Sequence, residues 1–158
     1  SLGTLNPARL SRLAEDGTLM SGDAPTKEAF LHAVMYRERI ATGAVVHLHS
    51  THSVAVSCLD GLDPASVLPP ITAYSVMRVG ALALAPYFPP GDERLAEAVA
   101  TLAARHHGPV VAGRDLAAAT DAIEELEETA RLYLLLRREK IRALSLAEVE
   151  EIRKKFPV

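Results

Sequence analysis

Apolar residues along the chain follow helical spacing in some segments and form short continuous runs in others. Stripes at helical spacing predict helices at 25–39, 92–105 and 115–140, with shorter ones at 51–59 and after Ser145. Continuous apolar runs predict strands from Ala44 into the histidines that follow it, at 76–84 and at 110–112. Because predicted strands and helices alternate, we expect one α/β domain over residues 1–158.

The segment Val45-Val46-His47-Leu48-His49 is the most informative part of the chain for chemistry. Successive side chains of a strand point to opposite faces, so His47 and His49 would share a face, about 6 to 7 Å apart. Two imidazoles at that separation can bind one divalent metal ion through nitrogen. The alternative is a pair of polar residues at the exposed end of a strand.

A metal site needs a third ligand, and four further histidines are available: His32, His52, His106 and His107. His107 precedes the Gly-flanked run 108–113, where the backbone can come close to a site. His32 lies on the predicted helix 25–39 and could equally be a core histidine. The residues alone do not select one of these four.

Composition restricts the compartment and the partners. Hydrophobic residues make up 49% of the 158 residues, charged residues make up 23%, and the formal net charge is −3. This balance, without a basic block, argues against nucleic acid or a membrane as partner. Cys58, the single cysteine, lies in an apolar run and is expected to be a small core residue. A chain without an internal disulfide, a signal peptide or a long apolar span suits the cytoplasm.

Three blocks of sequence together resemble the class II aldolase/adducin family: Pro25-Thr26-Lys27-Glu28, then 44–52 with its His-x-His, then His107-Gly108-Pro109. The resemblance covers almost the whole chain. It implies a three-layer α/β/α domain with a central, largely antiparallel sheet. It also implies a divalent metal ion, zinc by preference, and a homotetramer with active sites at subunit interfaces.

The resemblance also assigns roles to individual residues. His47, His49 and His107 would be the metal ligands, and Glu28 would be the acid that moves protons beside the metal. The alternative for Glu28 is a first-turn glutamate favoured by the helix dipole. Thr26 and Lys27 would bind the substrate, and Tyr74 matches a tyrosine that relatives use as a proton donor.

Within the family, the run 21–28, the run 72–80 and the run 107–113 resemble the branch that decarboxylates 3-oxo-tetronate 4-phosphate. This branch releases CO2 and dihydroxyacetone phosphate through a metal-stabilised enediolate, so the substrate would be a small phosphorylated sugar acid. The alternative is an L-fuculose-phosphate-type aldolase or a ribulose-phosphate 4-epimerase, since Lys27 and the run 108–113 argue against these enzymes without excluding them. A non-catalytic adducin-like binding domain would lack the metal ligands, and all three histidines are present.

For several polar residues the sequence leaves two possible roles open. Arg78 could pair with phosphate or with acidic side chains of a neighbouring element, and His52 could support the site or have a structural role. Tyr74 could equally serve packing. The run of glutamates at 124–128 is expected to be the solvated face of a helix.

Two departures from the family pattern lead to a further expectation. The N-terminal segment with two phosphate-binding turns is missing before Ser1, and no strand separates the predicted helix 92–105 from His106. A metal ligand needs a position good to a few tenths of an ångström, which such a junction would not provide. We therefore expect the working protein to be longer, and an intact mass of 16.9 kDa would contradict this.

Overall fold

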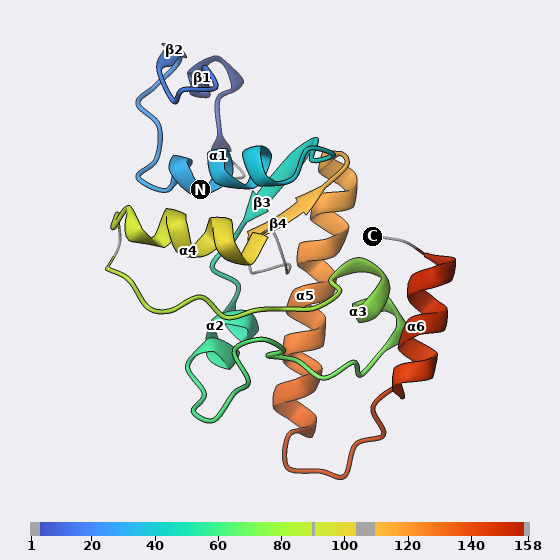
Figure 1. Ribbon diagram of the computed structural model, residues 1–158. Coiled ribbons are helices and arrows are strands. Elements are labelled where there is room, and N and C mark those ends of the chain that lie inside the picture. The colour runs from blue at the N-terminus through green and yellow to red at the C-terminus, as the bar shows by residue number, and fades with distance from the viewer. Residues whose placement is uncertain (1–3, 90, 104–109, 157–158) are drawn as a thin grey trace.

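The computed structural model describes residues 4–89, 91–103 and 110–156 (Figure 1). After a 3-10 turn, η2, at Pro7–Arg9, the strands are β1 (Arg12–Leu13), β2 (Leu19–Ser21), β3 (Ala44–His47) and β4 (Val110–Gly113). The helices are α1 (Ala29–Glu38), α2 (Thr51–Ser57), α3 (Ala73–Arg78), α4 (Arg94–Ala103), α5 (Leu116–Leu136) and α6 (Leu146–Lys155).

An antiparallel ladder of β3 and β4 lies at the centre of the helices. Ala44 pairs with Gly113 and His47 pairs with Val110, so the ladder runs the full length of both strands. The long helix α5 packs on both strands, and α1 packs on both strands and on α4 (Figure 1). The α/β class is therefore confirmed. This central sheet has two strands in the described part of the chain, so the wider sheet of a three-layer domain stays a prediction.

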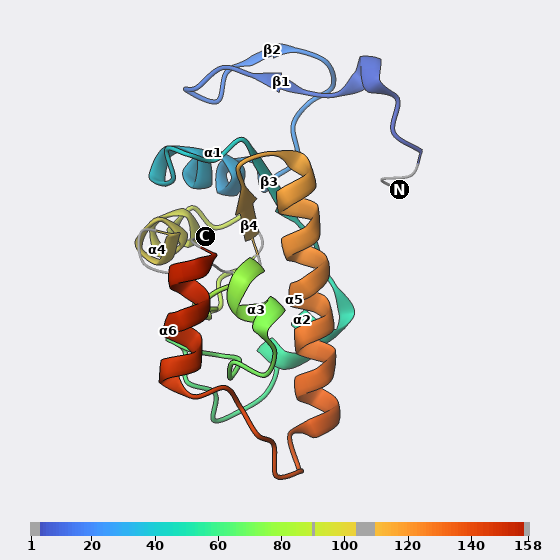
Figure 2. The same ribbon diagram turned by 90° about the vertical axis from the view of Figure 1, so that its right-hand side faces the viewer.

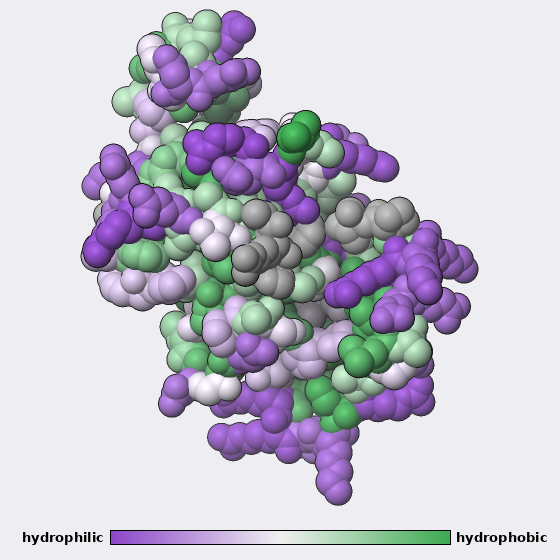
Figure 3. Space-filling model, in the orientation of Figure 1, coloured by the Kyte–Doolittle hydropathy of each residue, from purple (hydrophilic) through white to green (hydrophobic). Residues whose placement is uncertain are grey.

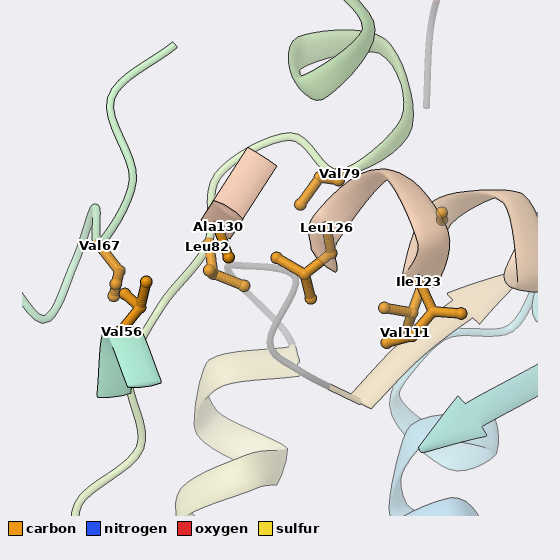
Figure 4. Packing of buried hydrophobic residues seen from close by; sticks show 9 residues of the cluster. Val56, Val67, Val79, Leu82, Val111, Ile123, Leu126 and Ala130 are labelled. Carbon is orange, nitrogen blue, oxygen red and sulfur yellow. The ribbon is translucent and has the colours of Figure 1, made fainter. Parts of the chain in front are cut away.

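The main core forms where α5 meets the rest of the chain. Leu126 of α5 is fully buried among Val56 of α2, Val79, Leu82 and Val111 of β4 (Figure 4). Burying each such side chain contributes about 1.5 to 3 kcal/mol. One helix thus joins the strand that follows His107 to the helix that follows His49.

The N-terminal hairpin of β1 and β2 was not predicted from the sequence. Arg12 pairs with Ser21, and Gly17, with φ +84°, makes the turn between the strands. The hairpin stands apart from the helical body (Figure 2). Its strands carry no buried residue, so hydrophobic periodicity gave no signal for them.

The predicted strand at 76–84 is wrong. Residues Ala73–Arg78 form α3, because the Thr72 side chain accepts a hydrogen bond from the Ser75 backbone amide and caps the helix. Gly80, with φ +70°, then turns the chain, and the apolar residues beyond it cross the core. The Val67 amide donates a backbone hydrogen bond to the Leu82 carbonyl there, and the burial of Leu82 and Ala83 accounts for the strand-like composition.

The remaining helices match the sequence pattern with shifted ends. Helix α1 begins four residues later than predicted, at Ala29, and α5 ends at Leu136 rather than at 140. Helix α6 begins after Ser145 as predicted, with a capping box in which Ser145 and Glu148 exchange hydrogen bonds.

The surface of the molecule bears on the expected burial of Cys58 and on the expected absence of a membrane span. Cys58 is exposed, not buried, because it follows the last turn of α2 on its outer side. In the described part of the chain, no helix combines the length and apolar composition that crossing a membrane requires. Hydrophilic residues cover much of the face shown in Figure 3, and hydrophobic residues appear between them in small groups.

Candidate metal centre

Three side chains from two neighbouring elements converge at one end of the β3–β4 ladder. His47 is the last residue of β3, His49 follows the strand by two residues, and Glu28 precedes the first residue of α1. One ligand atom from each of the three lies within 4.8 Å of the others. His49 lies beyond the strand, but the two rings still face the same side, with centroids 5.3 Å apart. The juxtaposition of His47 and His49 predicted from their spacing is therefore confirmed.

The distances fit one small divalent ion. Glu28 Oε2 lies 3.8 Å from His47 Nδ1 and 3.9 Å from His49 Nε2. These separations are too long for hydrogen bonds. Two ligands of a tetrahedral zinc ion, each bonded at about 2.1 Å, would lie about 3.4 Å apart. The Glu28 oxygen therefore lies within about half an ångström of the separation that a shared zinc ion would require from either histidine nitrogen.

The local backbone explains why the Glu28 carboxylate is available. Glu28 occupies the N-cap position of α1, but its side chain makes no capping hydrogen bond. The carboxylate points instead toward the two histidines, with 39% of the side chain exposed. A side chain that is not used in capping can serve as a metal ligand or move a proton.

Burial favours the neutral form of the His47 imidazole. Only 15% of the His47 side chain is exposed, and this burial lowers its pKa, while Glu28 acts in the opposite direction. His49 and His32 lower the same pKa further. A neutral imidazole keeps a lone pair for a metal, as ligation requires.

His32, which the sequence left open as a ligand, lies at the edge of this cluster. Its ring centroid is 6.2 Å from that of His47. Burial lowers its pKa, and Glu28 opposes the shift. His32 does not belong to the group of converging donors.

A cleft of about 230 Å³ opens beside the three side chains. Apart from Glu28, His47 and His49, its lining is apolar and comes from α1, β4, α4 and the segment before α4: Leu31, Met35, Ala83, Ala85, Leu95, Val99, Leu102, Ala103 and Val110. A site with polar groups at one end and apolar walls orients a small substrate and limits its contact with water.

Two other predicted residues lie close by in sequence. Thr26 and Lys27 are exposed and directly precede Glu28. Neither lines the described cleft. His106 and His107 lie outside the described residues, so the third predicted ligand stays a prediction.

Tyr74 and Arg78 lie on α3, away from the described cleft. Tyr74 is 58% exposed and lines a separate groove with acidic residues of α5. Arg78 forms an ion pair with Asp121 of α5, so its acidic-neighbour interpretation is the one observed. The structure does not bring Tyr74 of a chain together with Glu28 of the same chain.

The sequence missed Glu127. It was expected on the solvated face of α5, but both of its carboxylate oxygens accept hydrogen bonds from His52 and Ser53 at the start of α2. Burial alone would raise the pKa of Glu127, but these hydrogen bonds outweigh burial and hold the pKa below its usual range. A run of glutamates gives no sign of which one faces inward.

Comparisons with known proteins match most of the chain. Residues 1–134 match the family described as class II aldolase and adducin N-terminal domain. A 3-oxo-tetronate 4-phosphate decarboxylase from Escherichia coli K12 is 49% identical, over 96% of this chain and 75% of the relative. An L-fuculose phosphate aldolase from Methanococcus maripaludis is 33% identical, over 86% of this chain and 75% of the relative.

Solved structures give the same fold. The crystal structure of YgbL from Escherichia coli, described as a candidate aldolase/epimerase/decarboxylase, superimposes with a TM-score of 0.91 at 48% identity. That alignment covers 96% of this chain and 77% of the other. L-fuculose 1-phosphate aldolase superimposes with a TM-score of 0.86 over 99% of this chain and 76% of the other. Its identity of 21% makes this a likeness of fold.

Proposed function

The chain belongs to the class II aldolase and adducin family, and on that premise we propose that it decarboxylates 3-oxo-tetronate 4-phosphate. The observation that carries this proposal is the 49% identity to a decarboxylase of that substrate, against 33% to an aldolase. The reaction class is a carbon–carbon lyase. Its products would be CO2 and dihydroxyacetone phosphate.

His47 and His49 would hold the metal ion, with His107 as the third imidazole ligand. Zinc suits a set of imidazole nitrogens with an open position. When bound, the divalent ion supplies a Lewis acid next to the 3-oxo group. The distances of Glu28 to both histidines support its place at the edge of such a site.

Glu28 would complete the reaction as the proton donor. The bond between C1 and C2 breaks, C1 leaves as CO2, and the electron pair stays with C2 in conjugation with the 3-oxo group. C2 then takes a proton from the Glu28 carboxyl group. The apolar side chains of Leu31, Met35 and Val99 line the cleft beside Glu28, which suits the departure of neutral CO2.

Lys27 and Thr26 would bind the charged ends of the substrate. Their exposure just before Glu28 leaves the ammonium and the hydroxyl accessible to a carboxylate or a phosphate. Tyr74 would reach the site only from a neighbouring copy of the chain, because it lies on a different groove in its own copy. The leaving CO2 takes up no proton, so the one proton that C2 needs would come from Glu28.

The oligomeric state, the compartment and the partners are proposed from the family and from the composition. A homotetramer in the cytoplasm, with the full three-layer α/β/α domain, fits the family and the single exposed cysteine. We propose no nucleic-acid or membrane partner, because the net charge of −3 gives no attraction to phosphate backbones or acidic lipids.

The test is an assay of purified, metal-loaded protein with 3-oxo-tetronate 4-phosphate, in which a coupled reductase detects dihydroxyacetone phosphate. Glu28→Gln should lower kcat by about 10²- to 10⁴-fold, because it removes the proton donor. Glu38→Gln is the matched control, since it makes the same change at the last residue of α1, which does not line the cleft. Cleavage of L-fuculose 1-phosphate without decarboxylation would favour the aldolase instead.

A further inference from the structure

Helix α2 lacks a capping side chain of its own. Ser50 occupies the N-cap position, but its hydroxyl makes no capping hydrogen bond. The first amide groups of a helix need acceptors, and a carboxylate is a strong one at the positive end of the helix dipole. The acceptor comes from Glu127, 75 residues away on α5.

Both carboxylate oxygens of Glu127 accept hydrogen bonds from the first turn of α2. Oε1 accepts hydrogen bonds from the His52 amide, at 2.8 Å, and lies 2.7 Å from His52 Nδ1. Oε2 accepts from the Ser53 amide at 3.0 Å and from the Ser53 hydroxyl at 2.9 Å. Four short contacts to one carboxylate fix both the position and the rotation of the first turn of α2.

The segment between β3 and α2 carries His49. Leu48, His49 and Ser50 connect the last paired residue of the ladder, His47, to the first residue of α2. The His49 side chain is 74% exposed and therefore receives little support from packing. Its position depends on the two ends of this short segment, one held by the ladder and the other by Glu127.

We propose that Glu127 is a positioning residue for the metal ligand His49. It does not contact the ligand, but it anchors the backbone three residues beyond it, and α5 also packs on β3 at the other end. Metal ligands need positions accurate to a few tenths of an ångström. Loss of the hydrogen bonds from Glu127 should therefore lower the metal affinity by more than it lowers the stability of the fold. The inference rests on the proposed metal site.

The test compares two variants that each lose a helix cap. Glu127→Gln keeps the size of the side chain but replaces one acceptor oxygen by a donor, and Ser145→Ala removes the cap of α6, which packs on α3. The first readout is amide hydrogen exchange in metal-free protein. Residues 49–53 should exchange faster in Glu127→Gln, and Ser145→Ala should leave them unchanged.

The second readout is the dissociation constant for Zn²⁺, from competition with a chromophoric chelator. We expect it to rise at least about 10-fold in Glu127→Gln and to stay within about 2-fold in Ser145→Ala. Glu127→Asp, which keeps the charge, should recover part of the affinity and serves if the glutamine variant does not fold. Equal zinc affinities in folded Glu127→Gln and wild type would overturn the positioning role. If wild type binds no zinc, the proposed metal site fails, while the exchange data still decide whether Glu127 anchors the segment.

Discussion

At the residue scale, the two histidines of the candidate metal centre differ sharply in burial. Replacing the exposed histidine should therefore affect zinc affinity without affecting the stability of the fold. His49→Ala removes a side chain that is 74% exposed, so the free energy of unfolding should change by no more than about 0.5 kcal/mol. Zinc affinity should fall by about 100-fold or more, because a ligand is lost. Urea unfolding of metal-free protein and chelator competition measure the two effects separately.

His32→Ala is the companion experiment, because His32 was an open candidate for the same role. Its ring lies near His47 but outside the converging donors, so zinc affinity should stay within a few-fold of wild type. An equal loss of zinc affinity in the His32 and His49 variants would make His32 a ligand as well.

The lowered pKa of Glu127 predicts a dependence of stability on pH. The unfolded state binds more protons than the folded state between the folded pKa and the ordinary value of 4.5, so stability falls as pH falls through this window. The contribution is fully present above about pH 4.5. The difference in unfolding free energy between wild type and Glu127→Gln should therefore narrow as pH drops below that value. Urea titrations of both proteins from pH 7 to pH 3 measure it, and a constant difference would contradict the prediction.

At the residue scale, the sequence predicts contacts between residues close together in the chain better than contacts between residues far apart in it. The spacing of His47 and His49 predicts their juxtaposition, because a strand and its immediate continuation determine it. The bonds from Glu127 to His52 and Ser53 join residues 75 and 74 positions apart. No local pattern distinguishes Glu127 from Glu124 or Glu128, since the difference arises only when α2 packs on α5.

At the scale of elements, Gly113 determines how closely the ladder approaches α5. A Cβ atom at this position would lie 2.5 Å from the backbone nitrogen of Ala119. Gly113→Ala should therefore lower the unfolding free energy by about 2 to 3 kcal/mol, because backbone on both sides must shift. Gly61→Ala is the control, since its Cβ meets open space and the φ of +75° should cost only about 1 kcal/mol. Thermal unfolding of both variants compares them, and an equal loss would contradict the steric argument.

Element boundaries followed the sequence where local capping and periodicity agreed. Helix α6 begins after Ser145 because the capping box with Glu148 is readable in the sequence. Helix α3 was missed because its buried residue Val76, and Val79 just after it, belong to an apolar run that a buried strand would also show. The cap at Thr72 was the available signal, but a short helix set by core packing gives no full period.

At the scale of the whole molecule, the separation of Tyr74 from the cleft points to assembly. If the family's arrangement holds, a site takes Glu28 from one copy and Tyr74 from the next, and neither copy is complete alone. Light scattering on the eluting protein should then give a mass near four times the intact mass of one chain. A mass of one chain in a catalytically active sample would exclude shared sites.

Shared sites make a sharper prediction, because two inactive variants should rescue each other. Glu28→Gln and Tyr74→Phe each remove one half of a shared site, so each homotetramer should be nearly inactive. In tetramers refolded from an equal mixture, about a quarter of the sites pair an intact Glu28 with an intact Tyr74 and should recover activity. No recovery in mixed tetramers would contradict the shared site, whereas full activity of Tyr74→Phe alone would leave the tyrosine with packing as its role.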